Sequence, residues 1–303
     1  MVSKSKIYYK INLRMLANIL LITTTLLWGT SFIITKNLTQ EVPVFLYLGI
    51  RFSIALIGFL PFSIPRIKKI NKKLILYGTI TGMMYYIAIV LQTFGLQTTT
   101  AGKAAFITGL STIMVPFITW IGFKKTIKWR IWLAIPISII GMGFLLLEGE
   151  YGIIIGDFLV LLCAVLYAFF IILNDKYVRM VDVYLYSVIQ LIVISVLSFG
   201  GSFLLNEMYD FISISLSFWL IIFYMGLAVT TGSFIFQNWS QKHQGPTQTA
   251  IIFTLEPVFA VIFASFIIGD ETMTLLGWVG CALIFVAIFI TVIKNTANEN
   301  GIR

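Results

Sequence analysis

The feature that most limits the fold of this chain is a series of long apolar stretches separated by short polar ones. A helix of about 20 apolar residues crosses the hydrocarbon core of a bilayer, where backbone groups must bond within their own segment. Ten such runs cover nearly the whole sequence, at about 16–35, 44–64, 74–96, 104–123, 129–147, 156–173, 184–205, 216–239, 247–268 and 273–293. We therefore expect an all-α integral membrane protein with ten transmembrane helices and no soluble domain.

The net charge of +9 does not indicate a nucleic-acid partner, because its placement follows membrane topology. If the N-terminus is cytoplasmic, the outer loops carry one basic residue, Lys103, and most of the acids. The predicted inner segments hold Lys4, Lys6, Lys10, Arg14, Arg66, Lys68, Lys69, Lys72, Lys73, Lys124, Lys125, Lys128, Arg130, Lys176, Arg179, Lys242, Lys294 and Arg303. This is the positive-inside pattern, and it predicts a multi-pass protein of the cell membrane with both termini cytoplasmic.

The ninth run carries an acid and a proline, Glu256-Pro257, near its middle. An isolated charged side chain at that depth costs about 2.5–3.5 kcal/mol on insertion scales, so Glu256 is expected to face a polar cavity or a partner. Pro257 removes a backbone donor and predicts a bend beside the carboxyl group. Two interpretations stay open, a substrate or proton site and an acid held by neighbouring helices for packing alone.

The chain reads as two five-helix halves, residues 1–150 and 151–303. Trp28 aligns with Tyr167, and Leu110 aligns with Leu255, when the second half is laid on the first. Because each half has an odd number of spans, the second must be inverted relative to the first. Secondary transporters with this plan place the substrate near the midplane, between the repeats.

Several residues within the spans are candidates for the wall of a central cavity. Trp28 lies in mid-span, where an interfacial anchor is not needed, and its ring face suits an apolar or cationic group. Gln92 and Gln237 lie on spans that would be repeat mates, and interhelical hydrogen bonding is their alternative role. The predicted substrate-binding residues are Trp28, Tyr85, Gln92, Thr108, Tyr167, Gln237, Trp239 and Glu256.

Two cations lie unusually deep in the predicted spans. Lys36 is about one turn inside the first span, and Arg51 is one to two turns inside the second. Both are able to extend to the outer surface along their aliphatic stems. Arg51 has the further alternatives of pairing with an acid or with a substrate carboxylate.

The sequence argues against several other functions. With one histidine, His243, it predicts no His-rich metal cluster, and it contains no GxxxxGK[ST] loop for ATP. Cys163 and Cys281 both fall within spans and are interpreted as packing residues instead of a disulfide. We expect no cofactor, no metal and no enzymatic activity, because a membrane enzyme would need catalytic groups clustered at one depth.

Five motifs in order resemble the EamA family of the drug/metabolite transporter superfamily: Trp28-Gly29-Thr30-Ser31-Phe32, Arg51-Phe52, Thr99-Thr100-Ala101-Gly102-Lys103-Ala104-Ala105-Phe106, Leu255-Glu256-Pro257-Val258-Phe259-Ala260 and Gly269-Asp270-Glu271. The resemblance implies two inverted five-helix repeats and alternating access. It also implies a cavity built from spans one, three, four, six, eight and nine, and transport of small metabolites such as amino acids, often outward.

Two departures from the family pattern make the halves chemically unequal. Lys124-Lys125-Thr126 stands where members often carry an acid after the fourth span. Ser111-Thr112 stands where the first half would copy Glu256-Pro257. A mechanism that needs paired acids is therefore not expected.

We predict a secondary transporter that exports a small organic metabolite such as an amino acid, with Glu256 as the candidate proton carrier. The alternatives are a lipid flippase and a membrane-embedded scaffold or partner protein. The expected partners are the small-molecule substrate, the lipid bilayer and a second copy of the chain in a homodimer.

Overall fold

The computed structural model describes residues 4–122, 124, 126–146, 154–207, 215–268 and 275–292, and every regular element among them is helical. The boundary between residues 150 and 151 and the Gly269-Asp270-Glu271 motif lie outside these residues. In chain order the elements are α1 (Lys4–Glu41), α2 (Val44–Ser63), η1 (Ile64–Lys69), α3 (Lys72–Leu96), α4 (Ala101–Ile121), α5 (Trp129–Leu146), α6 (Ile155–Val178), α7 (Val183–Leu204), α8 (Leu216–Tyr224), η2 (Met225–Gly232), α9 (Ser233–His243), α10 (Pro246–Phe253), α11 (Glu256–Ile268) and α12 (Leu275–Val292).

The helices have the length and the surface of membrane spans. In the described part of the chain, eight helical segments are long and apolar enough to cross a bilayer, and two shorter apolar helices lie within α5 and α12. Large apolar side chains such as Ile57, Val196 and Phe289 stand exposed on the outside of the bundle. A surface of this kind fits acyl chains, not water, and the chain is a multi-pass membrane protein.

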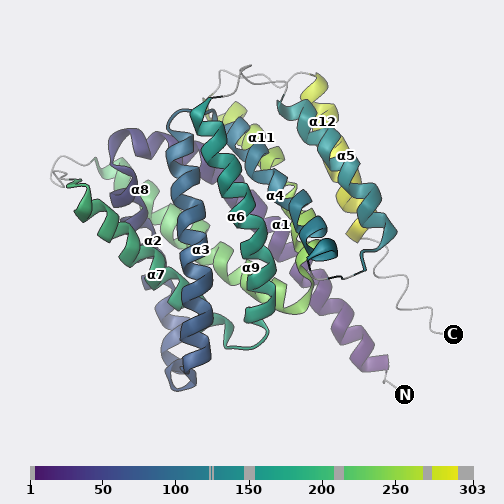
Figure 1. Cartoon of the computed structure of the whole chain (residues 1–303), viewed down its shortest axis with the longest axis horizontal. Helices are drawn as coiled ribbons and strands as arrows, with labels where there is room; N and C mark the ends of the chain where they lie inside the picture. Colours follow the sequence, from purple (N-terminus) through teal and green to yellow (C-terminus); the bar gives the residue numbers. More distant parts are fainter. Residues whose placement is uncertain are drawn as a thin grey trace.

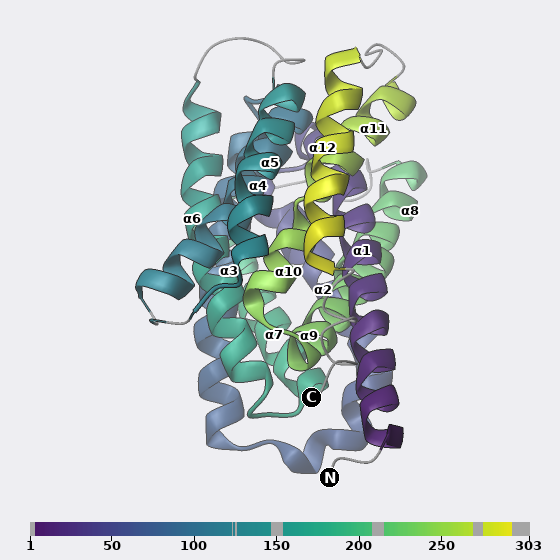
Figure 2. The same cartoon turned by 90° about the vertical axis from the view of Figure 1, so that its right-hand side faces the viewer.

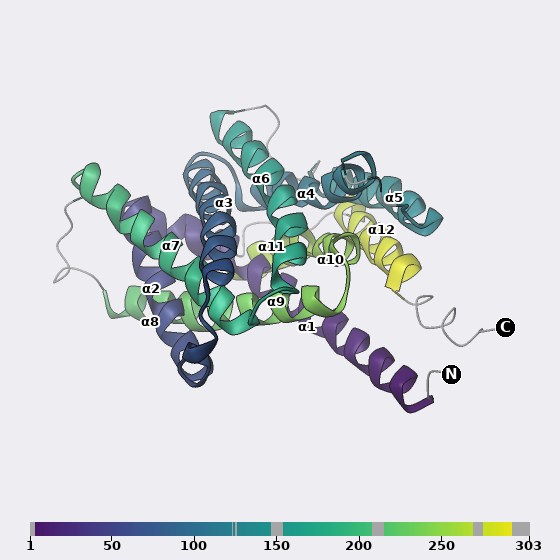
Figure 3. The ribbon, with the colours of Figure 1, turned by 60° about the horizontal axis from the view of Figure 1, so that its bottom comes forward.

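The bundle is organised around α1, which packs against both α9 and α11. Helices α5 and α12 lie side by side at one edge, and α2, α7 and α8 lie at the opposite edge (Figures 1 and 3). Between these edges α3 and α4 both pack on α6. We call the end where α1 starts and η1 lies the lower end, and the end where α6 starts the upper end (Figure 2).

The observed helix starts follow local capping chemistry. The side chain of Thr100 accepts a hydrogen bond from the Lys103 amide at 3.2 Å at the start of α4, and Asn71 caps α3 in the same way at 2.9 Å. Helix α10 begins at Pro246, a residue suited to a first turn because it lacks an amide hydrogen. The polar turns before α3, α4 and α10 therefore supply the residues that start these helices.

Two spans contain irregular turns in their middle. The ninth predicted span breaks between α10 and α11, so that α11 starts at Glu256, which confirms the bend expected beside Pro257. The eighth span contains a π-helical segment, η2, which its apolar pattern does not predict. Segments of π-helix occur frequently at functional sites because they redirect side chains.

Small residues allow α3 to approach α7 closely. A Cβ atom built on Gly78 would lie 2.7 Å from the Cβ of Ile189, and one built on Gly82 would lie 3.0 Å from the Cα of Gln190. The helices could not pack at this distance with larger residues there. Gly78 and Gly82, four residues apart, therefore serve to pack these two helices.

Candidate substrate site

Five aromatic side chains from four helices meet in the middle of the bundle. The ring of Tyr85 on α3 lies 5.3 Å from Tyr167 and 5.1 Å from Phe170, both on α6. It also lies 5.1 Å from Phe234 on α9 and 6.1 Å from Phe52 on α2. All five side chains are buried, and Tyr85 stands at their centre.

Trp28 on α1 extends this group toward the break between α10 and α11. Its ring lies 6.3 Å from Tyr167 and 4.9 Å from Phe253 at the end of α10. We call the group made of Trp28, Phe52, Tyr85, Tyr167, Phe170, Phe234 and Phe253 the central aromatic cluster. The structure thus joins three of the predicted site residues, Trp28, Tyr85 and Tyr167, through direct ring contacts.

Glu256 lies at the bend, inside the bundle. Its side chain is 7% exposed and does not face lipid. It follows Phe253, the cluster member at the end of α10, by three residues at the start of α11. No hydrogen bond or ion pair to this carboxyl group is present among the described residues.

Close packing of α1 on α11 keeps this acid against the first helix. A Cβ atom on Gly29 would lie 2.5 Å from the Cβ of Phe259, so a larger residue at position 29 would push the two helices apart. Gly29 follows Trp28 of the cluster, and Phe259 lies one turn after Glu256. The Gly29 contact therefore sets the distance between Trp28 and the bend.

The predicted amide residues have different environments. Gln92 donates a hydrogen bond from Nε2 to the Thr108 hydroxyl at 3.0 Å, which ties α3 to α4 within the core. Gln237 is 1% exposed, and its Nε2 has no hydrogen-bond partner among the described residues. Because Phe234 and Gln237 are three residues apart in α9, they lie on the same face of that helix.

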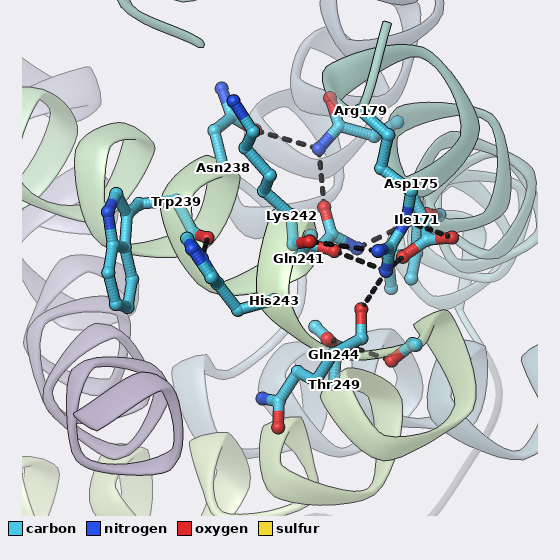
Figure 4. Close-up of polar contacts among 12 residues, drawn as sticks. Ile171, Asp175, Arg179, Asn238, Trp239, Gln241, Lys242, His243, Gln244 and Thr249 are labelled. Carbon is cyan, nitrogen blue, oxygen red and sulfur yellow. Dashed lines mark hydrogen bonds and ion pairs between the residues drawn. The ribbon is translucent and has the colours of Figure 1, made fainter. Parts of the chain in front are cut away.

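Trp239 is not part of this assembly. It is half-buried near the end of α9, where its ring lies 4.1 Å from that of His243 (Figure 4). It has no ring contact with the central aromatic cluster. Its contact with His243 belongs to the lower end of the bundle instead.

Arg51 is the buried cation nearest to the cluster. Its side chain is 4% exposed, so it turns into the bundle and does not extend to the surface. Its Nε donates to Thr230 Oγ1 at 2.9 Å, and its Nη1 lies 3.3 Å from the Tyr47 hydroxyl and 3.5 Å from Thr35 Oγ1. Its guanidinium carbon lies 5.7 Å from the ring centre of Phe52, a cluster member.

The π-helical segment η2 supplies one of these contacts. Thr230 Oγ1 donates to the carbonyl of Met225, five residues earlier, at 2.8 Å. Thr231 donates in the same way to Gly226 at 3.1 Å, and also to Ala55 of α2 at 3.0 Å. The wide turn therefore fixes the Thr230 hydroxyl where it accepts from Arg51.

Below the cluster, buried amide side chains connect α6, α7 and α9. Asn174 donates to Asn238 Oδ1 at 2.7 Å and to Gln241 Oε1, and its own Oδ1 accepts from Tyr186 and Gln190 at 3.0 Å each. These four bonds satisfy the full capacity of its amide group. We call the group made of Thr81, Asn174, Tyr186, Ser187, Gln190, Asn238 and Gln241 the amide network.

The remaining members extend the amide network to α3. Gln190 donates to Thr81 Oγ1 at 2.9 Å, and Thr81 is also 2.7 Å from the Tyr186 hydroxyl. Asn238 donates to Ser187 at 2.8 Å and to Gln190 Oε1 at 3.2 Å. Four helices are thus held together by polar groups that bond to one another.

Arg179 continues this arrangement at the lower end (Figure 4). It pairs with Asp175 one turn earlier at 2.8 Å. It also donates to the backbone carbonyls of Gln241 at 2.7 Å, Lys242 at 2.8 Å and Gln244. A cation at the C-terminus of a helix satisfies carbonyls that have no partner within the helix, so Arg179 caps α9 from α6.

The upper end is tied by a different set of contacts. Lys103 and Asp157 form an ion pair at 2.6 Å between α4 and α6, and Thr99 donates to the same carboxylate at 2.6 Å. Lys36 of α1 donates to the Thr99 carbonyl at 2.8 Å. The second deep cation of the sequence analysis therefore bonds to the turn that precedes α4.

A cavity of about 440 Å³ lies at the lower end, away from the central aromatic cluster. It is lined by Thr119, Ile172, Leu173, Asp175, Lys176, Arg179, Met180, Gly245 and Pro246. Its walls are the ends of α4 and α6 and the start of α10, beside the Arg179 contacts. Within the described residues, no group of three or more His, Cys, Asp or Glu side chains has a geometry for metal binding.

The sequence pattern of the EamA-like transporter family matches residues 15–147 and again residues 154–293. The chain belongs to this family. An uncharacterized transporter of Archaeoglobus fulgidus is 28% identical over 281 residues, which are 93% of this chain and 87% of the relative. The uncharacterized transporter YetK of Bacillus subtilis is 23% identical over 88% of this chain and 84% of its own length.

A further relative, an uncharacterized transporter of Methanothermobacter thermautotrophicus, is 27% identical over 75% of this chain and 66% of that relative. One solved crystal structure superposes with a TM-score of 0.75 at 16% identity, covering 93% of this chain and 98% of that chain. This likeness establishes a shared fold. The family resemblance drawn from the five motifs is confirmed.

Sequence reasoning missed most of the aromatic partners and the amide network. Phe52, Phe170, Phe234 and Phe253 look like ordinary lipid-facing residues in a sequence with 26 phenylalanines. A signal for the network was present, because Asn174 and Gln190 lie in apolar spans where uncompensated amides are costly. Both cysteines are buried in separate hydrophobic clusters and form no disulfide with each other, as predicted.

Proposed function

We propose that this chain is a secondary transporter that moves a small organic metabolite, such as an amino acid, by alternating access. The observation that carries the proposal is the central aromatic cluster with Glu256 beside it, built by helices from both halves of a member of a transporter family. A buried acid without a described protein partner is costly in a membrane, and such residues mark substrate or ion pathways. Export is the proposed direction.

We propose that ten crossings form two inverted repeats. Two matches to one family pattern, each to about half of the chain, support this plan. The packing supports it as well, because α2 packs on its mate α7 and α5 packs on its mate α12. Residues related by a twofold axis meet when they lie close to it, and the aligned residues Trp28 and Tyr167 are in ring contact.

Under this proposal the two ends of the bundle are the two gates. The amide network and Arg179 close the lower end, and the Asp157 contacts close the upper end. The lower end carries η1 with Arg66, Lys68 and Lys69, so the positive-inside rule makes it cytoplasmic. Opening toward the cytoplasm then requires the amide network to part.

The experiment is transport in proteoliposomes, with a library of amino acids and other small metabolites outside and an imposed pH gradient. We expect at least one solute to accumulate, and Glu256→Gln to abolish the part driven by the gradient while the protein stays folded. Thr23→Val is the matched control, because the Thr23 hydroxyl donates to the Ile19 carbonyl of its own helix. This variant should keep the uptake of the wild-type chain.

If the wild-type chain moves none of the solutes, the transporter assignment is contradicted. If Glu256→Gln keeps the full gradient-driven uptake, Glu256 is not the proton carrier.

A further inference from the structure

We propose that Arg51 binds the carboxylate of the transported solute, and that the solute is a small organic acid with an apolar body. Amino acids are the zwitterionic members of this class. The inference rests on the proposed transport function and adds a residue that the predicted site did not contain. It depends on the donors of the guanidinium group, on its charge and on its position.

The donors of Arg51 are only partly used. Nε donates to Thr230, and Nη1 makes two longer contacts with hydroxyl groups of Tyr47 and Thr35. Nη2 has two further hydrogens, with no hydrogen-bond partner among the described residues. A guanidinium group offers paired donors that match the two oxygens of a carboxylate, and Nη2 together with Nη1 presents such a pair.

No acid forms an ion pair with Arg51 in the described part of the chain. Each partner of the guanidinium group is a neutral hydroxyl. Glu207, which follows α7, accepts instead from the amide of Leu46 at the start of α2 at 2.9 Å. Asp157, the acid at the upper end of α6, bonds to Lys103 and Thr99.

An uncompensated cation in this place is expensive. Burial of an unpaired charge is strongly unfavourable, and a neutral residue could join the same hydroxyl groups without that cost. The hydroxyls also bond to other groups, since Thr35 lies 2.9 Å from the Tyr47 hydroxyl and Thr230 donates to Met225. The positive charge is therefore not required to hold these helices together.

The position of Arg51 places the missing anion beside the aromatic cluster. The guanidinium carbon of Arg51 lies 5.7 Å from the ring centre of Phe52, and Glu256 follows Phe253 by three residues. A cation and an acid thus lie beside members of the same cluster, one for a carboxylate and one for an ammonium group. Gln237, one turn below Phe234, adds a buried amide nitrogen that also lacks a described partner.

The test is binding to the purified full-length chain in lipid nanodiscs, measured by isothermal titration. The probes are L-phenylalanine, L-leucine and L-threonine, each compared with its carboxamide and with the matching decarboxylated amine. We expect at least one acid to bind on the order of 30-fold more tightly than its amide, because only the carboxylate forms a buried ion pair with Arg51. Arg51→Gln should remove this preference.

Two further variants keep the test decisive. Arg51→Lys retains the charge without the paired donors and should keep part of the preference. Thr230→Val removes the hydroxyl that orients Nε and should weaken the preference less than Arg51→Gln does. Arg66→Gln, the same change at a partly exposed arginine of the lower end, should leave it intact.

Equal binding of acid and amide by the wild-type chain would overturn the inference, as would no binding of any acid. A preserved preference in folded Arg51→Gln would overturn it too. If Arg51→Gln does not fold, an unchanged preference in both Arg51→Lys and Thr230→Val has the same consequence. Transport of solutes that lack a carboxylate would overturn only this inference, whereas absence of any transport would contradict the proposed function itself.

Discussion

The amide network and the centre of the bundle differ in how fully their buried polar groups are bonded. In the network Asn174 uses every donor and acceptor of its amide on neighbouring side chains. At the centre, Arg51 lacks an ionic partner in the described structure, and the Nε2 of Gln237 lacks a hydrogen bond there. Satisfied groups hold helices together, whereas groups left without partners cost stability until a ligand, here the proposed solute, bonds to them.

The largest effect we expect comes from Asn174→Leu. This change leaves Asn238, Gln241, Tyr186 and Gln190 each short of a bond, and unsatisfied buried groups cost about 1–3 kcal/mol apiece. We predict a loss of about 3–5 kcal/mol in the free energy of unfolding after partial relaxation. Denaturant titration of the purified protein in detergent micelles measures it.

Ser198→Ala is the matched control for that loss. Ser198 is fully buried on α7, and its hydroxyl has no hydrogen-bond partner in the part of the chain that the structure describes. Removing it should change the free energy of unfolding by less than about 0.5 kcal/mol. Equal losses for Asn174→Leu and Ser198→Ala would contradict the distinction between satisfied and unsatisfied groups.

Arg179→Met tests the polar cap at the lower end. The change takes the donor away from the carbonyls of Gln241, Lys242 and Gln244, which end α9. Because the arginine side chain is 40% exposed, water replaces part of what is lost. We predict destabilisation of about 1–2 kcal/mol, measured in the same titration.

Lys176→Met, three residues earlier on α6, is the control for Arg179→Met. Its ammonium group lies 5.7 Å from the ring of Tyr177 and, among the described residues, makes no hydrogen bond or ion pair with the end of α9. It should cost less than about 0.5 kcal/mol. A smaller loss for Arg179→Met than for Lys176→Met would show that the contacts to α9 contribute nothing.

The broad fold was predictable because its cause is local. A bilayer requires backbone groups to bond within each span, so the apolar runs located the helices to within a few residues for most spans. Glu256-Pro257 likewise gave the bend and the burial of the acid. Chain length and hydrophobicity decide these features, and both can be read from a single sequence.

Features that depend on contacts between distant segments were not predictable. Gln237 and Trp239 are two residues apart on one helix and looked equivalent, yet Gln237 faces the core and Trp239 contacts the ring of His243. Rotation of α9 follows from its packing on α1 and from the π-helical turn before it, neither of which leaves a pattern in the sequence. The same holds for the hydroxyl groups that meet Arg51.

Arg51→Met should have a smaller effect on stability than Arg179→Met, although Arg51 is the more deeply buried of the two. Its removal abolishes the cost of burying an unpaired charge, while Thr35, Tyr47 and Thr230 keep hydrogen bonds with other groups. We predict a change of less than about 1 kcal/mol in the free energy of unfolding, of either sign. A loss as large as that of Asn174→Leu would make Arg51 a structural residue.

The smallest effect is expected at Gln237, and its control lies one turn away on the same helix. Gln237→Leu removes a buried amide nitrogen without a described partner, so stability should stay equal or rise by up to about 1 kcal/mol. Gln241→Leu makes the same change at a residue that accepts from Asn174 and donates to the Ile171 carbonyl at 3.2 Å, and it should be clearly destabilising. Equal destabilisation by both changes would mean that Gln237 is bonded within the protein, and its amide would then not be free for a solute.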